Sequence, residues 1–352
     1  MSSRVNQPSA DFDLYGLHAR IAGDWADVVS AIRLDFDWFE SHAVDAPADV
    51  RVTVEHRAPD YDSLGDVRAA YVTPQHTVYR LDGRTAVDYG GVVSLVQAGG
   101  THALVQGDDA RLARRAAFDF LLARAHDHLD AHGLPRVLGL GLGGAQGSVL
   151  VLLPPGGGKT TLALRALKED GIRFFSETSP LLDRKGRMHP FPFPLWVRGD
   201  SAEAKELPAD HARRVTETNV RLLELAAFVD RVARKPQPLR HIVLAHRSLA
   251  HDSRLEPVGR AHALAPLLRQ SVMGFSFGDA VRFLVRRGGA RDPAKEQRGG
   301  ERVGTFRAAG AATRAAVRAR CAAAALQHAL VWELSLGRDR EGNWRALEQL
   351  LR

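Results

Sequence analysis

The chain has little cysteine and no long apolar run. Its 352 residues include one cysteine, Cys321, which cannot form an internal disulfide and cannot supply a zinc cluster built on cysteines. No stretch of about 18 uninterrupted apolar residues occurs, and residues 1–13 are polar. We therefore expect neither a membrane-spanning helix nor a secretory signal, and we expect the protein to be cytoplasmic and without a membrane partner.

Lysine is also scarce, although the chain is basic, with a formal net charge of +7. Arginine supplies nearly all of the 48 basic residues and is scattered through an Ala- and Gly-rich chain, which indicates compositional drift more than a nucleic-acid surface. No basic stripe interleaved with aromatic residues favours nucleic acid either. Scarcity makes each lysine informative; the six are Lys159, Lys168, Lys185, Lys205, Lys235 and Lys295.

The hydrophobic share of 45% and the charged share of 25% are typical of a folded protein with a sizeable core. Helical spacing predicts helices over 24–31 and 109–132, and short β-rich runs between 50 and 105 predict an antiparallel meander with a hairpin turn at Asp82-Gly83.

Apolar strands and helices alternate from residue 137 onward, which favours an α/β fold. We expect a smaller α+β segment over 1–108 and a core over 109–352, and we expect a mobile loop near 286–304 because that stretch is charged, Gly-rich and almost without apolar residues. The expected core strands cover 137–142, 148–153, 172–175, 242–245 and 331–336, and the expected helices cover 159–169, 261–270, 307–330 and 344–351.

One glycine-rich turn lies between an apolar strand and a predicted helix. Glycines let successive N–H groups point into one cavity, and a helix N-terminus adds partial positive charge, so the turn predicts binding of a nucleotide's phosphates. A lysine here reaches the β and γ oxygens, and the next hydroxyl binds Mg²⁺. The expected nucleotide-binding residues are Pro155, Gly156, Gly157, Gly158, Lys159, Thr160 and Thr161.

The turn departs from the standard G-x-x-x-x-G-K-[ST] pattern at its first position, which is Leu153. A flexible turn carrying a solvated lysine is the alternative interpretation. The strand before the turn, the helix after it and the hydroxyl pair Thr160-Thr161 occur together, and an empty turn would require none of them.

An acidic residue, Glu177, follows the next predicted strand, 18 positions after Lys159. At that spacing a carboxylate lies beside the γ-phosphate, where it can bind metal or accept a proton from an attacking hydroxyl. In many nucleotide hydrolases the acidic strand lies much farther along the chain, so the short spacing points to a particular group of phosphate-binding proteins.

The run from Leu150 to Pro194 resembles the nucleotide-binding core of the HPr kinase/phosphorylase family. It is similar in its loop, helix and acidic strand, in Leu181-Leu182-Asp183, and in the proline-rich stretch after His189. It is more closely similar to the HPr-kinase-related proteins that accompany gene cassettes for modified peptides and other accessory functions.

The resemblance implies a phosphoenolpyruvate-carboxykinase-like P-loop core with a mixed sheet, and a kinase that moves the γ-phosphate of ATP to a hydroxyl of a protein or peptide, with serine as the favoured acceptor. It also implies Mg²⁺, held by Thr160 and Glu177, and it leaves open whether the chain forms homo-oligomers, as the resembling kinases do. Lys159, Glu177 and Arg247 are the expected catalytic residues.

Three departures separate the chain from the HPr kinase/phosphorylase family. Glu177-Thr178 stands where that family has paired aspartates, the strand over 137–141 lacks the family's histidine, and the signature loop tied to dephosphorylation is missing. We therefore expect kinase activity without phosphorylase activity. The alternative is a catalytically degenerate protein that binds nucleotide and acts as a regulator.

Four further residues have both a functional and a structural interpretation. Arg247 and Arg198 each follow an apolar segment and could neutralise a phosphoryl group, but a solvent-facing arginine is the more common case in this arginine-rich chain. Asp183 precedes a turn and favours a turn-stabilising role. His189 could contact substrate, although a lone histidine is more often structural.

Overall fold

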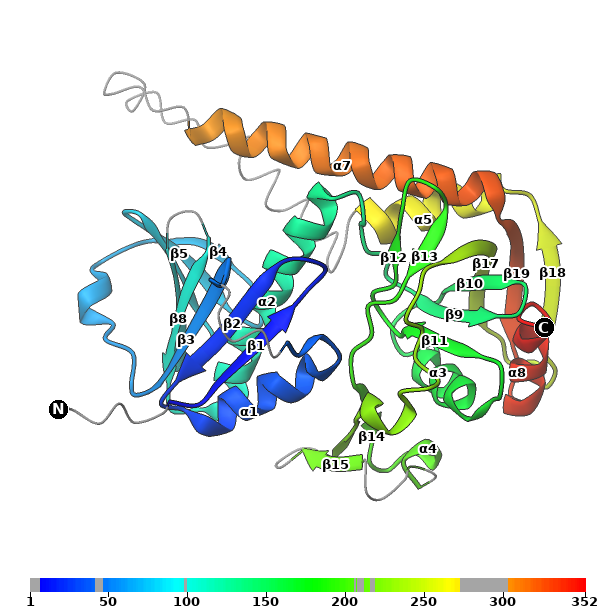
Figure 1. Ribbon diagram of the computed structural model, residues 1–352, viewed down its shortest axis with the longest axis horizontal. Coiled ribbons are helices and arrows are strands. Elements are labelled where there is room, and N and C mark those ends of the chain that lie inside the picture. The colour runs from blue at the N-terminus through cyan, green and yellow to red at the C-terminus, as the bar shows by residue number, and fades with distance from the viewer. Residues whose placement is uncertain are drawn as a thin grey trace. The chain divides into compact units, whose positions relative to one another are not determined.

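The computed structural model describes residues 7–41, 47–97, 100–205, 207, 212–215, 219–272 and 303–352 (Figure 1). The internal contacts divide the chain into two compact units, Met1–His128 and Leu129–Arg352. The fold is α/β with mixed sheets, as expected. Among the described helices, none is both long enough and apolar enough to cross a membrane.

The described part of the first unit consists of an eight-stranded sheet and two helices. Its order is β1-β2-β3-β8-β7-β6-β5-β4. The helices are α1 (Ala26–Asp35) and α2 (Ala110–Ala131), and short 3₁₀ turns, η1 and η2, cover Asp37–Phe39 and Asp62–Leu64. The strands are β1 (Ser9–Asp13), β2 (His18–Gly23), β3 (Val50–His56), β4 (Ala69–Val72), β5 (Thr77–Leu81), β6 (Arg84–Asp88), β7 (Val92–Gln97) and β8 (His102–Gly107).

One face of this sheet is buried under the helices. Ile21, Val52 and Ala103 lie opposite one another in register and are fully or almost fully buried. The Phe36 ring, just after α1, lies 5.3 Å from the Phe12 ring of β1 and 5.3 Å from the Phe118 ring of α2. These apolar contacts join both helices to the sheet.

Strands β4 to β8 form the expected antiparallel meander, but β3 does not belong to it. It pairs in parallel with β2 and with β8; the connection from β2 to β3 contains α1, as parallel neighbours require a crossover. The division after His128 also differs from the expected boundary at 108/109. Most of α2 belongs to the first unit, where Arg114 forms an ion pair with the buried Asp35 of α1.

The second unit is built around a mixed sheet of order β11-β9-β10-β17-β13-β12, with β19 on β17 and β18 on β19. Its helices are α3 (Lys159–Lys168), α5 (Ala261–Val272), α7 (Val303–His328) and α8 (Arg340–Glu348). The strands are β9 (Leu140–Gly144), β10 (Gly147–Leu152), β11 (Arg173–Ser176), β12 (Leu181–Leu182), β13 (Arg187–His189), β17 (Gln237–Arg247), β18 (Arg254–Val258) and β19 (Leu330–Leu336).

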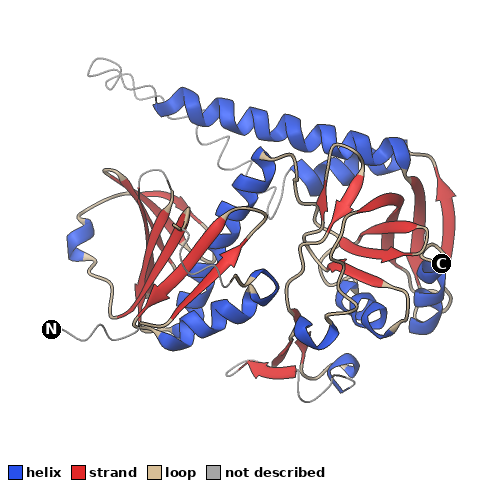
Figure 2. Ribbon diagram, viewed as in Figure 1, coloured by secondary structure: helices blue, strands red, loops and turns tan. Residues whose placement is uncertain are grey.

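Figure 2 shows α5 and α7 on one side of this sheet and α3 on the other. The core between the sheet and α7 includes Cys321 and Ala325, whose small side chains let the Ala-rich helix pack closely on the sheet, and Ile242 and Leu150 belong to the same buried cluster. Burial raises the pKa of the Cys321 thiol to about 11, which agrees with a small buried residue and not a nucleophile.

A small antiparallel sheet of order β14-β16-β15 follows the proline-rich stretch, with the one-turn helix α4 (Ala202–Lys205). The strands are β14 (Leu195–Arg198), β15 (Ala212–Val215) and β16 (Val220–Leu223), and the 3₁₀ turn η4 (Leu225–Phe228) leads back to the main sheet. The mobile loop expected near 286–304 lies outside the described residues, except that Val303 and Gly304 begin α7.

Candidate functional site

Three strands of the second unit end at the same edge of the sheet. Strands β10 and β17 are parallel neighbours. Strand β9 is antiparallel to both β10 and β11, so β11 runs in the same direction as β10. The carboxyl ends of these three strands are therefore brought together, with the glycine-rich loop after β10, Glu177 after β11 and Arg247 as the last residue of β17.

The loop between β10 and α3 is shaped by its glycines. Gly156 has a φ of 74° and Gly158 a φ of 112°, both in the left-handed region that favours glycine. A Cβ on Gly158 would also lie 2.9 Å from Arg247 Nη2. Gly158 is the N-cap of α3, and no side chain caps that helix end, so the first-turn amides are available to an anion.

The side chain of Lys159 turns back over the loop. Its Nζ donates hydrogen bonds to the carbonyl oxygens of Leu153, at 2.8 Å, and Pro154, at 3.2 Å, and only 8% of the residue is exposed. Burial lowers the pKa of Lys159, and the nearby Glu177 carboxylate opposes that shift. The ammonium thus lies over the loop, where phosphate oxygens can replace the two carbonyl oxygens.

Glu177 comes directly after β11 and contacts the first turn of α3. The Thr160 hydroxyl donates a hydrogen bond to Oε1 of Glu177. Burial raises the pKa of Glu177, while the Thr160 hydrogen bond and the Lys159 charge oppose that rise. A carboxylate with a raised pKa is a stronger proton acceptor, so this group suits a general base.

Arg247 lies at the carboxyl end of β17 and is attached to the loop. Its Nε donates a hydrogen bond of 2.8 Å to the Gly157 carbonyl oxygen. Among the described residues the two Nη atoms have no hydrogen-bond partner. The structure therefore places Arg247 beside Gly157 and Gly158; the residue is exposed, as an arginine facing solvent would be, and it is bonded to the loop as well.

Thr160 and Glu177 fit the requirements of Mg²⁺ in part. They supply a hydroxyl oxygen and a carboxylate oxygen, which are hard ligands of the kind Mg²⁺ prefers. Within the described residues, no group of three or more His, Cys, Asp and Glu side chains could hold a metal ion. Phosphate oxygens and water would have to complete the coordination of a cation here, as is usual for Mg²⁺ bound with a nucleotide.

Asp183, His189 and Arg198 lie outside this cluster. Asp183 accepts hydrogen bonds from the backbone N–H groups of Lys185 and Arg187 and from the side chains of Arg187 and His189. It stabilises the turn between β12 and β13, as expected, and His189 shares in that role. Arg198 pairs with Asp200 on the exposed side of β14. Pro155 is exposed, and Thr161 is partly buried in the first turn of α3.

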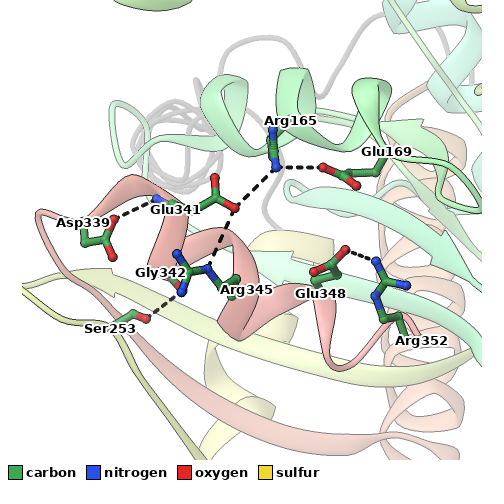
Figure 3. Close-up of polar contacts among 9 residues, drawn as sticks. All are labelled: Arg165, Glu169, Ser253, Asp339, Glu341, Gly342, Arg345, Glu348 and Arg352. Carbon is green, nitrogen blue, oxygen red and sulfur yellow. Dashed lines mark hydrogen bonds and ion pairs between the residues drawn. The ribbon is translucent and has the colours of Figure 1, made fainter.

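The sequence analysis did not predict the ion pairs that connect α3, the helix after the glycine-rich loop, to α8 near the C-terminus of the chain. Arg165 of α3 forms ion pairs with Glu169, at 2.9 Å, and with Glu341 of α8, at 3.4 Å (Figure 3). Asp339 caps α8 by accepting a hydrogen bond from the Glu341 N–H. Arg165 and Glu341 are 176 residues apart, so no local pattern could have indicated the contact.

Comparisons with known proteins give no evidence for a function. No protein-family model and no curated protein matches the sequence. The case for a function therefore consists of the loop, its lysine, the carboxylate and the arginine, which the fold brings to one edge of the sheet.

Proposed function

We propose that the protein is an ATP-dependent kinase that transfers the γ-phosphate to a hydroxyl group of a protein or peptide. One observation carries the proposal: the carboxyl ends of β10, β11 and β17 bring together a glycine-rich loop, a carboxylate hydrogen-bonded to Thr160, and an arginine bonded to the loop. A phosphate cradle, a proton acceptor and a cation are the groups that phosphoryl transfer requires.

The loop and its helix bind the phosphate chain. The backbone N–H groups of Gly156 and Gly158 and the uncapped start of α3 surround the β-phosphate, while the Gly157 N–H donates to the Pro154 carbonyl oxygen and holds the turn. Lys159 exchanges the Leu153 and Pro154 carbonyl oxygens for β- and γ-phosphate oxygens. Mg²⁺, held by the hydroxyl and carboxylate oxygens described above together with the phosphates, would neutralise charge on the triphosphate.

Glu177 and Arg247 act on the transfer itself. The acceptor hydroxyl oxygen forms a bond to the γ-phosphorus, the bond from that phosphorus to the β–γ bridging oxygen breaks, and ADP leaves. The hydroxyl proton passes to the Glu177 carboxylate, whose raised pKa favours accepting it. The Nη atoms of Arg247 neutralise negative charge on the phosphate chain as the bond breaks.

The acceptor class and the finer fold assignment rest on the family resemblance. The run from Leu150 to Pro194 is similar to the HPr-kinase-related proteins, and we assign the second unit to the same phosphoenolpyruvate-carboxykinase-like P-loop group. That assignment makes the enzyme a serine kinase acting on a protein or peptide. The mixed sheet, with β9 antiparallel between β10 and β11, agrees with it.

Transfer of radiolabel tests the proposal. The purified protein is added to a cell extract with Mg²⁺ and ATP labelled at the γ-phosphate, and labelled protein or peptide is counted. Lys159→Ala and Glu177→Gln should each lower labelling by about 100-fold or more. Lys168→Ala is the matched control, because Lys168 is exposed in the last turn of the same helix. Undiminished labelling by both site variants would show that the protein is not this kinase.

A second candidate function is a regulator that binds nucleotide without transferring phosphate. It is favoured by Thr178, which follows Glu177 and leaves the site with one carboxylate. The two functions differ in turnover, since a regulator binds ATP without releasing ADP. Measuring ADP in the labelling reaction, together with the bound fraction of ATP, separates them.

A further inference from the structure

Leu249 is unusually exposed for an apolar residue in an ordered loop. Its exposed fraction is 93%, and the next most exposed large apolar residue of the described chain, Val72, reaches 57%. Single exposed leucines are common on protein surfaces and need no explanation by themselves. Leu249 differs from other exposed leucines in its position, because it lies two residues after Arg247, which is bonded to the glycine-rich loop.

The loop that carries Leu249 is fixed on both sides. The Ser248 N–H donates to the Leu336 carbonyl oxygen at 2.8 Å, and the Ala250 carbonyl oxygen accepts from the Arg338 N–H at 2.9 Å. Farther along, the Ser253 hydroxyl donates to the carbonyl oxygen of Gly342 in α8 (Figure 3). The hydrogen bonds therefore fix the backbone on both sides of the exposed Leu249. A ligand that covers this side chain loses little free energy to ordering of the loop.

The sheet order places Leu249 on a definite side of the phosphate loop. In the order β11-β9-β10-β17, the loop follows β10 and Glu177 follows β11; on the other side, Arg247 ends β17 and Leu249 comes two residues later. In the proposed function Glu177 accepts the proton of the attacking hydroxyl, so the hydrogen-bonded pair of Thr160 and Glu177 lies at the γ-phosphate end of a bound triphosphate. A phosphate chain that starts there and crosses the loop toward Arg247 would have its nucleoside end on the Leu249 side of the loop.

We infer that Leu249 is the apolar platform on which the base of ATP rests. The inference rests on the proposed function and adds the nucleoside subsite to it. The acceptor is excluded from this position because an attacking hydroxyl must approach the γ-phosphorus opposite the leaving oxygen, which is the Glu177 side. A flat base laid on an exposed leucine removes apolar surface of both partners from water.

Binding of two Mg²⁺ complexes, ATP and inorganic tripolyphosphate, tests the inference by titration calorimetry on the full chain. Leu249→Asn should weaken ATP binding about fivefold and leave tripolyphosphate binding unchanged, because only ATP has a base. Leu330→Asn is the matched control: Leu330 is 56% exposed but begins β19, at the opposite edge of the sheet. It should change neither affinity.

The outcomes separate the two proposals. Suppose that the wild-type protein binds both ligands, and that Leu249→Asn leaves the ATP affinity unchanged or lowers both affinities equally. The base then does not rest on Leu249, while binding of phosphate by the glycine-rich loop remains supported. If the wild-type protein binds neither ligand, the phosphate loop and the nucleoside subsite both fall. A selective loss of ATP affinity supports both.

Discussion

The pKa values of Lys159 and Glu177, the two titratable groups beside the glycine-rich loop, are shifted so that the charged form of each is disfavoured. Burial lowers the pKa of Lys159 and raises that of Glu177, and each is partly compensated by the charge of the other. The lysine gains carbonyl partners within the loop and the glutamate gains the Thr160 hydroxyl. Both side chains are thus partly shielded from solvent. A charge there acts more strongly on a bound phosphate than it would in water.

Glu177→Gln should stabilise the folded protein at neutral pH while it removes phosphate transfer. Because burial raises the pKa of Glu177, the ionised carboxylate costs folding free energy, on the order of 1 kcal/mol for a partly buried polar group. The neutral amide avoids that cost. The difference should be absent below the ordinary value of 4.5 and should grow as pH rises through the raised pKa.

Thermal unfolding of the wild type and the Glu177→Gln variant at several pH values measures this difference. A variant less stable than the wild type at pH 8 would mean that the carboxylate is not desolvated at a net cost. A difference that does not depend on pH would contradict the account in the same way.

Parts of the candidate site follow from the sequence and parts do not. The glycines, Lys159, Thr160 and Glu177 could be picked out because loop, helix and acidic strand are close in the chain. Arg247 could be named only as one arginine among many, since its contact with Gly157 spans 90 residues. The Leu153 and Pro154 carbonyl oxygens that hold Lys159 are backbone groups, which side-chain patterns do not reveal.

At the scale of elements, the turn between β12 and β13 depends on one carboxylate. Asp183 accepts from two backbone N–H groups and two side chains within six residues. Burial raises the pKa of Asp183, but the hydrogen bonds from His189 and Arg187 outweigh it and bring the pKa to about 2. Asp183 is therefore ionised over most of the pH range, and its stabilising contribution is lost only when the carboxylate is protonated in strong acid.

Asp183→Ala should destabilise the second unit by about 2–3 kcal/mol, because four hydrogen bonds in a partly buried turn lose their acceptor at once. Asp200→Ala is the control: it removes an exposed carboxylate that pairs with Arg198, and no measurable change is expected. Urea unfolding measures both. The loss should shrink as pH falls from the ordinary value of 3.8 toward 2, and equal stabilities of the two variants at pH 7 would contradict the role given to Asp183.

Helices and strands with clear patterns could be predicted, and their pairing could not. The helix α3, the strands β10 and β19, and the Ala-rich helix α7 lie within a few residues of their expected ranges. Strands β1 and β2 were missed although both alternate, as in Ser-Ala-Asp-Phe-Asp of β1, because these runs are short and β1 lies in a stretch that the sequence analysis treated only as polar. The parallel pairing of β3 with β8 depends on contacts across the whole first unit, which local sequence does not encode.

At the scale of the whole molecule, the chain consists of two units with separate sheets, and the candidate site lies entirely in the second. The expected boundary at 108/109 followed the end of the last β-rich run. The structure keeps α2 with the first unit because Phe118 contacts Phe36 and Arg114 binds Asp35, which are tertiary contacts that a change in local pattern cannot show.

The central claim is that the turn at Gly156 to Gly158 holds a triphosphate under Lys159. Titration of the wild-type protein and of Lys159→Ala with Mg²⁺ and ATP measures it directly. The account predicts that the wild type binds and that the variant binds about 10- to 100-fold more weakly, since a charge-assisted contact to phosphate is lost. Equal affinities of the two proteins, or no binding by the wild type, would contradict it.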